Sequence, residues 1–190
     1  MNKIGVSVSA FVFLAWSAQL SAATIYNATL SGATEVPPTG STATGSATLT
    51  LSGDSLTVVE SFSGLIGGPA SAAHIHCCTL PGANAPVAIP FTNFPVATSG
   101  TYTNTFDLAS TTTYTASFLN GSGGGTAAGA EAVVITALNA GEAYLNIHTS
   151  TFPGGEIEGF AVAATPEPGS LLLLGFGLAA IAMSRRFNRT

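Results

Sequence analysis

The chain has 190 residues and carries only 4 Lys+Arg against 9 Asp+Glu. Its four basic residues, Lys3, Arg185, Arg186 and Arg189, all lie near the ends. The 142 residues of Thr24–Thr165 therefore hold eight carboxylates and no basic residue, a formal charge of −8. Such a region lacks the cations that bind nucleic-acid phosphates or clamp nucleotides. This charge pattern excludes nucleic-acid binding and phosphoryl transfer as functions.

Residues 1–23 have the layout of a secretory signal peptide. Lys3 precedes an apolar run over Ile4–Leu20, and the small residues Ser21, Ala22 and Ala23 follow. This order is typical of signal peptides, with cleavage after Ala22 or Ala23. An N-terminal membrane anchor is the alternative, but three serines interrupt the apolar run. We therefore expect this segment to direct export.

Residues 165–190 form a second targeting segment. The motif Pro166-Glu167-Pro168 precedes the apolar stretch Leu171–Met183, and a cluster with Arg185 and Arg186 follows. The stretch is shorter than the roughly 20 residues that span a bilayer, and the arginines favour the cytoplasmic side. A short permanent anchor is one interpretation. The order of the three parts, however, closely resembles the PEP-CTERM sorting signal of Gram-negative bacteria.

The resemblance to PEP-CTERM proteins implies an address rather than an activity. In that family a membrane-embedded exosortase recognises the tail and cleaves near the Pro-Glu-Pro motif. The resemblance thus implies transient membrane association through the C-terminal helix, followed by transfer to the cell surface or the extracellular matrix. Exopolysaccharide and surface proteins are the partners that this location suggests.

Residues 24–164 are predicted to form one mainly β domain. Their number suits a single domain with its own core, and they are rich in Thr, Val, Ala, Ser and Gly. Turn signals such as Gly53-Asp54 and Pro153-Gly154-Gly155 separate short runs with strand character. The predicted strands are Thr24–Leu30, Ala43–Leu51, Ser55–Phe62, Ala70–Cys77, Pro86–Phe91, Thr101–Leu108, Thr113–Leu119, Glu142–Thr149 and Glu156–Ala163. This spacing predicts an antiparallel β-sandwich.

The region between the last predicted strands contains at most one short helix. Asn120–Ala130 is rich in Gly and Ser and is predicted to be a flexible loop. Glu131–Asn139 is ambiguous, because Val133-Val134-Ile135 favours a strand while the alanines and Gly141 favour a helix. Of the two, we predict the helix.

The chain contains three histidines, His74, His76 and His148, in two predicted strands. Because residues i and i+2 of a strand share a face, His74 and His76 lie opposite Ile75. In the second strand Tyr144, Asn146 and His148 share a face opposite Leu145 and Ile147. If the apolar residues face the core, all three imidazoles lie on the outer side.

The two histidine segments carry a family resemblance. Ala73-His74-Ile75-His76, together with Tyr144-Leu145-Asn146-Ile147-His148-Thr149 and Phe152-Pro153-Gly154-Gly155-Glu156-Ile157, resembles the CHRD domain first described in chordin. The resemblance covers about residues 24–163 and implies an all-β, immunoglobulin-like extracellular module. This chain has Glu158 where the family often has a basic residue after Gly-Glu-Ile. The resemblance to bacterial members of the family implies no particular activity for this chain.

Three imidazoles from two strands would suit Zn or Cu. A joint metal site requires the two strands to be neighbours; otherwise the chain has three solvated imidazoles without a joint role. Cys78 shares the parity of the histidines and is a candidate fourth ligand. The adjacent Cys77 and Cys78 leave three alternatives open: a vicinal disulfide, free or ligating thiols, or pairing between molecules.

A hydrolase is not indicated. No Gly-x-Ser-x-Gly motif is present, and Glu156 and Glu158, on one strand face, do not flank a substrate and are expected to be solvated. We therefore expect an exported, non-enzymatic module with a structural or binding role at the surface or in the matrix of a Gram-negative bacterium. The alternative is a Cu- or Zn-binding or redox protein centred on the three histidines.

Overall fold

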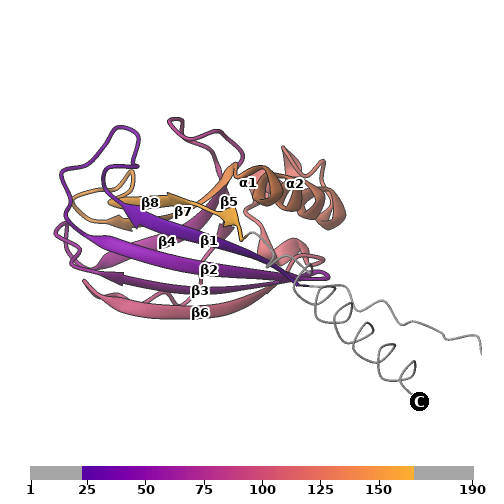
Figure 1. Cartoon of the computed structure of the whole chain (residues 1–190). Helices are drawn as coiled ribbons and strands as arrows, with labels where there is room; N and C mark the ends of the chain where they lie inside the picture. Colours follow the sequence, from indigo (N-terminus) through magenta and orange to yellow (C-terminus); the bar gives the residue numbers. More distant parts are fainter. Residues whose placement is uncertain (1–22, 165–190) are drawn as a thin grey trace, which may run out of the picture.

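The computed structural model describes residues 23–164 of the chain. These residues form nine strands and two α-helices, with both helices between the sixth and the seventh strand (Figure 1). The strands are β1 (Thr24–Ser31), β2 (Thr44–Ser52), β3 (Ser55–Ser63), β4 (Ala70–Cys77), β5 (Val87–Pro90), β6 (Gly100–Asp107), β7 (Ala143–Thr149), β8 (Ile157–Phe160) and β9 (Val162–Ala163); the helices are α1 (Ala116–Asn120) and α2 (Ala127–Ala140). The predicted mainly β, antiparallel class is confirmed.

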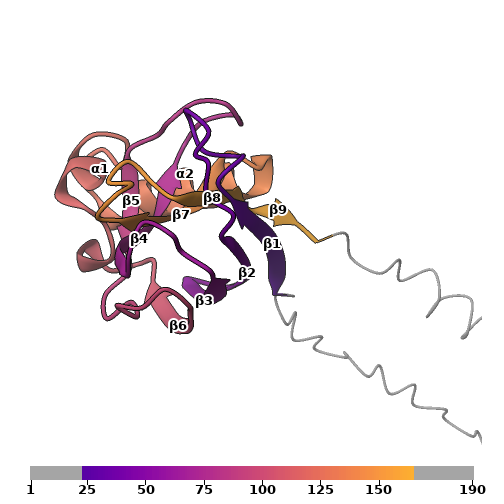
Figure 2. The ribbon, with the colours of Figure 1, turned by 90° about the vertical axis from the view of Figure 1, so that its left-hand side faces the viewer.

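The strands form one curled sheet in the order β5-β4-β7-β8-β1-β2-β3-β6, and β9 pairs with β1. Viewed from the side in Figure 2, the sheet wraps around a common interior. Its two ends approach through aromatic side chains, because Phe91, just after β5, stacks on Tyr102 and Phe106 of β6 with ring centroids 4.9 and 5.5 Å apart. The two ends of the curled sheet thus approach each other, which is compatible with the predicted sandwich.

Alternating burial explains why these segments form strands around a core. In β1, Tyr26, Ala28 and Leu30 are buried and the residues between them are exposed. The same period of two continues in β2 and β3, which a two-residue turn over Gly53-Asp54 joins. Gly53 has a φ of +55°, which a glycine adopts without strain.

The predicted helix is confirmed and is longer than expected. Helix α2 begins after Thr126, whose hydroxyl accepts a hydrogen bond from the Gly129 N–H at 3.1 Å, and ends at Gly141 in the left-handed conformation. Its first turn lies inside the segment predicted to be a loop, so the Gly- and Ser-rich loop is shorter than Asn120–Ala130.

The predicted strand Thr113–Leu119 is wrong, and with it the limit of one helix. A 3-10 turn and helix α1 occupy this region instead. Thr115 caps α1 by accepting a hydrogen bond from the Phe118 N–H, and Phe118 is buried in the core. The Thr- and aromatic-rich composition indicates a strand, but capping by Thr115 and the burial of one aromatic ring favour a helical turn here.

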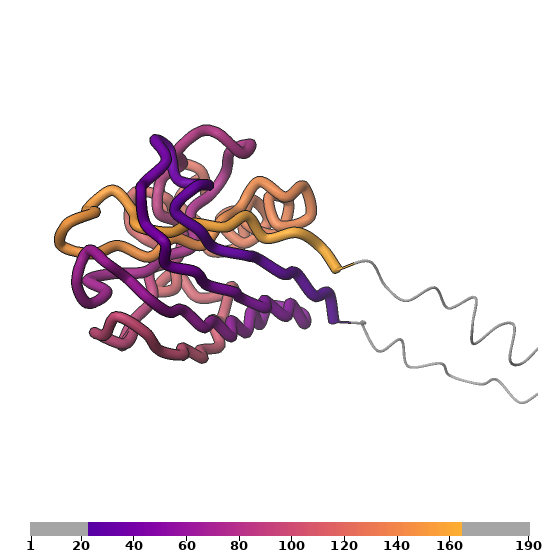
Figure 3. The backbone as a smooth tube through the Cα atoms, turned by 60° about the vertical axis from the view of Figure 1, so that its left-hand side comes forward, coloured from indigo at the N-terminus to yellow at the C-terminus, as the bar shows by residue number. Residues whose placement is uncertain are grey.

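The two ends of the described region lie side by side. The N–H of Ala164 donates to the carbonyl of Ile25 at 2.7 Å, and the backbone tube leaves the domain at neighbouring points (Figure 3). The predicted signal peptide and sorting tail lie outside the described residues, apart from Ala23. Among the residues that are described, no helix has the length and apolarity needed to cross a membrane.

Candidate metal-binding site

Strands β4 and β7 are antiparallel neighbours, which is the arrangement that a joint histidine site requires. In their register His74 lies opposite Asn146, His76 opposite Tyr144, and His148 opposite Ala72. Ile75, Leu145 and Ile147 point into the core, so the predicted separation of the two faces is correct. The imidazoles are nevertheless not freely solvated, because His76 is 8% and His148 9% exposed.

The three imidazoles converge on one point. They offer one nitrogen each, and these three atoms lie within 4.8 Å of one another. Nδ1 of His74 lies 3.2 Å from Nε2 of His148. Nitrogen ligands that hold Zn²⁺ tetrahedrally at roughly 2.0–2.1 Å are themselves about 3.3 Å apart. The His74–His148 pair already has that separation, and the nitrogen of His76 lies within 4.8 Å of both.

Backbone carbonyls orient two of the rings. Nδ1 of His76 lies 2.8 Å from the Ala85 carbonyl, and Nδ1 of His148 lies 3.1 Å from the Pro153 carbonyl. A carbonyl oxygen only accepts, so each Nδ1 carries the proton and each Nε2 keeps its lone pair. Nε2 of His76 is buried and has no hydrogen-bond partner among the described residues. Metal-ligating histidines characteristically use the second ring nitrogen in this way.

Tyr144 and Ala85 hold the ring of His76 in place. The tyrosine ring stacks on His76 with a centroid distance of 4.8 Å and an interplanar angle of 5°. Ala85 donates its N–H to the Tyr144 hydroxyl at 3.1 Å while its carbonyl accepts from His76. Together these contacts fix the direction of the unpartnered Nε2.

All three imidazoles are neutral at pH 7. Burial lowers the pKa of His74 to about 4, with further lowering from the positive charges that His148 and His76 would carry. Burial also lowers the pKa of His76 and of His148, although their carbonyl partners Ala85 and Pro153 offset part of the effect. Neutral imidazoles have the free lone pairs that a metal ion needs.

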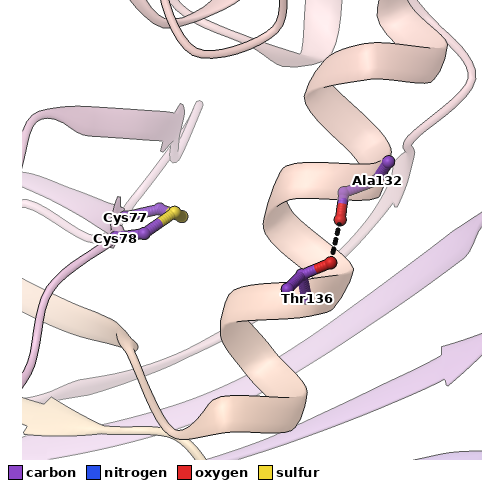
Figure 4. The surroundings of a disulfide bond; sticks show 4 residues. All are labelled: Cys77, Cys78, Ala132 and Thr136. Carbon is purple, nitrogen blue, oxygen red and sulfur yellow. Dashed lines mark hydrogen bonds between the residues drawn. A yellow bond between two sulfur atoms is a disulfide. The ribbon is translucent and has the colours of Figure 1, made fainter.

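The cysteines lie apart from this cluster. The structure joins Cys77 and Cys78 in a vicinal disulfide whose sulfur atoms point toward α2 (Figure 4). Cys77 is buried in the core, while Cys78 is exposed beside Ala132 and Thr136. A disulfide sulfur is not a thiolate ligand, so Cys78 does not complete the ligand set in this arrangement.

The carboxylates predicted to be solvated, Glu156 and Glu158, are both fully buried. Glu156 accepts four hydrogen bonds: from the Ser41 hydroxyl at 2.7 Å, the Ile66 N–H at 2.7 Å, the Gly67 N–H at 3.0 Å and the Thr149 hydroxyl at 2.8 Å. Burial alone would raise the pKa of Glu156, but these hydrogen bonds outweigh burial and lower it. Strand parity alone predicts the wrong burial for these two carboxylates, because the loops 32–43 and 64–69 fold over this end of the sheet.

Glu158 belongs to a second polar group, with Asn146 and Glu35. Burial raises the pKa of Glu158 to about 7. Burial, followed by the charge of Glu158, raises the pKa of Glu35 to about 8. Asn146 is the Cα partner of Glu158 on the adjacent strand and is 2% exposed. The sequence gives no signal for Glu35, because it lies in the loop between β1 and β2.

The fold and this site define an antiparallel β module with a candidate metal-ligand set on a loop-covered face. Comparison with protein families gives a match to the CHRD domain over residues 26–161 and to the PEP-CTERM protein-sorting motif over residues 164–186. The chain therefore belongs to the CHRD domain family and ends in a PEP-CTERM sorting motif, as the sequence resemblance implied. Searches of curated proteins and of solved structures found no match.

The sorting motif match covers Pro166, Glu167, Pro168, Arg185 and Arg186, which lie outside the described residues. It implies exosortase processing and indicates export to the cell surface or the extracellular space of a bacterium. Both matched families are of a non-catalytic kind.

Proposed function

We propose that the domain is a non-enzymatic module of the bacterial surface or matrix that binds a transition-metal ion, Zn²⁺ or Cu²⁺, through His74, His76 and His148. The observation that carries the proposal is the pair of ring nitrogens, on His76 and His148, whose opposite nitrogens bond to backbone carbonyls. Each of the two Nε2 atoms therefore keeps its lone pair, and Nε2 of His148 lies 3.2 Å from Nδ1 of His74.

The ligand chemistry selects the class of ion. Imidazole nitrogens suit Zn and Cu, whereas Ca and Mg prefer oxygen ligands. Three histidines leave one coordination position, which water or a partner's side chain would fill. The domain charge of −8 favours cations near its surface.

Isothermal titration with Zn²⁺ and with Cu²⁺ at pH 7 tests the proposal. We expect one ion per chain, and a loss of affinity of at least about tenfold for each of His74→Gln, His76→Gln and His148→Gln. Thr103→Ala, an exposed residue on the distant strand β6, is the control and should bind as the wild type does. Wild-type protein without stoichiometric binding, or three histidine variants that bind normally, would contradict the proposal.

The setting of the module is the second part of the proposal. We propose a Gram-negative host, residues 1–23 as a cleaved signal peptide, and transient membrane association of the sorting tail. Exopolysaccharide or surface proteins are then the partners within reach of the mature domain. The match to the sorting motif supports this setting.

A further inference from the structure

Three oxygen-bearing side chains gather next to the histidine cluster, and one of them, Asn146, lies on the strand of His148 and opposite His74. Asn146 on β7 and Glu158 on β8 are Cα partners, so their side chains leave the sheet on the same face. Glu35 reaches this face from the loop between β1 and β2, where the neighbouring Thr34 hydroxyl donates to the carbonyl of Glu158. Asn84 holds the same loop by donating to the Val36 carbonyl at 2.8 Å.

Gly155 shows how close these side chains lie to one another. A Cβ at this position would fall 2.5 Å from the side-chain oxygen and nitrogen of Asn146 and 2.6 Å from Oε1 of Glu35. The amide of Asn146 and the carboxylate of Glu35 thus converge on one point, and only a residue without a side chain fits between them and the backbone.

Four buried oxygens in this group have no hydrogen-bond partner among the described residues: Oε1 of Glu35, Oδ1 of Asn146, and Oε1 and Oε2 of Glu158. The three residues are 4%, 2% and 0% exposed, respectively. Glu156, equally buried, satisfies its carboxylate with four donors. Buried carboxylate oxygens without donors are stabilised by protonation or by a positive partner, and residues 23–164 contain no Lys or Arg that could be this partner.

We propose that Glu35, Asn146 and Glu158 form a second cation site, which takes a hard divalent cation of the Ca²⁺ class. This site differs from the proposed zinc or copper site because all of its donors are oxygens. Ca²⁺ prefers oxygen ligands, whereas Zn and Cu suit imidazole nitrogens. Two carboxylates and one amide offer up to five oxygens, and the two negative charges balance one divalent ion. Water supplies the remaining positions of a coordination number of 6–8.

An opening leads to this group from the surface. Glu35 lies in the wall of a pocket of about 480 Å³, between the loop that contains Thr34 and Pro38 and the loop that contains Pro81 and Gly82. Both loops rise above β7 and β8 in Figure 1. Phe160, two residues after Glu158 on the same face of β8, also lines the pocket. A cation can therefore approach Glu35 from the surface, whereas Asn146 and Glu158 do not line the pocket.

Calcium titration of the purified, chelator-treated protein tests the second site. With CaCl₂ at pH 7 we expect one Ca²⁺ per chain, with a Kd on the order of 10⁻⁴–10⁻³ M, the range of extracellular modules. Glu35→Gln and Glu158→Gln should each weaken binding by at least about tenfold. The matched control is Glu142→Gln, since Glu142 is a half-buried carboxylate before β7, and it should bind Ca²⁺ as the wild type does.

Glu35 lies in a loop, so Glu35→Gln keeps the test valid if Glu158→Gln does not fold. A His74→Ala and His148→Ala double variant should lose Zn²⁺ and still bind Ca²⁺, which separates the failure of one site from that of the other. Absence of calcium binding to the wild type, or wild-type affinity in folded Glu35→Gln, would overturn the second site.

Discussion

At the scale of single residues, the buried carboxylates of the domain differ in their surroundings. Glu156 is stabilised by four hydrogen bonds, whereas the charge of Glu158 helps to raise the pKa of Glu35 in the proposed cation site. Glu60 has neither arrangement: it is 1% exposed inside the curled sheet, and both its oxygens lack partners among the described residues. Its registered neighbours are Ala47 on β2 and Tyr102 on β6.

Glu60 should make stability depend on pH. Burial raises its pKa from 4.5 to about 8. Tyr102 is the titratable group opposite Glu60, and it is neutral below pH 10 because burial raises its pKa. A raised carboxyl pKa contributes stability that is fully present below pH 4.5 and is lost as the pH rises through about 8.

Glu60→Gln removes this titration. We expect the variant to unfold like the wild type at pH 4.5, but to be more stable by roughly 2–4 kcal/mol at pH 8. Urea unfolding of both proteins at the two pH values measures the difference in their free energies of unfolding. The other titrating groups contribute equally to both proteins, so their effects cancel. The same difference at both values would contradict the assignment.

Gly155 should tolerate no side chain. Its φ of +134° is strained for any other residue, and a Cβ would collide with Asn146 and Glu35. We expect Gly155→Ala to lower the free energy of unfolding by roughly 2–4 kcal/mol. Gly154→Ala is the adjacent control, because nothing lies within 4 Å of its Cβ position, and it should stay within about 0.5 kcal/mol of the wild type. Equal effects of the two substitutions, measured by urea unfolding, would refute the packing argument.

At the scale of elements, the N-terminal cap of α2 contributes to the stability of this helix. Thr126→Ala removes the side-chain acceptor for the Gly129 N–H and should destabilise the domain by about 1 kcal/mol. Thr136 in the same helix bonds only to the Ala132 carbonyl, four residues earlier (Figure 4). Thr136→Ala should therefore be neutral or slightly stabilising, since alanine favours helices more than threonine does. Thermal unfolding of both variants checks the contrast, and a larger loss for Thr136→Ala would contradict it.

Strand parity predicts much of the sheet and of the histidine face. It places His74, His76 and His148 opposite the core because apolar residues alternate with them in both strands. It does not predict that β4 and β7 are neighbours, since β5, β6 and both helices lie between them in sequence. The carbonyls of Ala85 and Pro153 are equally hidden, because every residue has such a group and only the folded loops bring these two to the imidazoles.

The failures also have physical causes. Glu156 and Glu158 look like solvated residues on an outer face, but loops far away in sequence bury them. The segment that contains α1 has a strand-like composition, and the cap at Thr115 with the burial of Phe118 overrides it. Tertiary contacts decide both cases, and a period of two in the sequence contains no information about them.

At the scale of the whole molecule, the two ends of the domain emerge at neighbouring points, next to the paired strands β1 and β9. The three histidines lie on the neighbouring strands β4 and β7, and the loops that contain Glu35 and Pro81 rise above β7 and β8.

The sorting motif predicts where the protein goes. Deletion of Leu171–Thr190 should abolish exosortase processing and retain the protein before it reaches the surface, because the truncated chain lacks the apolar stretch and the arginines. Fractionation of cells that express each form measures this. An unchanged location of the truncated protein would show that the motif does not direct sorting.

The proposed metal site holds one ion through three imidazoles of this domain. X-ray absorption at the zinc edge of the zinc-loaded protein tests it most directly, because the shell around the ion reports ligand type and distance. We predict three imidazole nitrogens at roughly 2.0–2.1 Å and one further ligand, such as a water oxygen. A shell of oxygens without imidazole scattering, or no zinc retained by the protein, would contradict the three-histidine site.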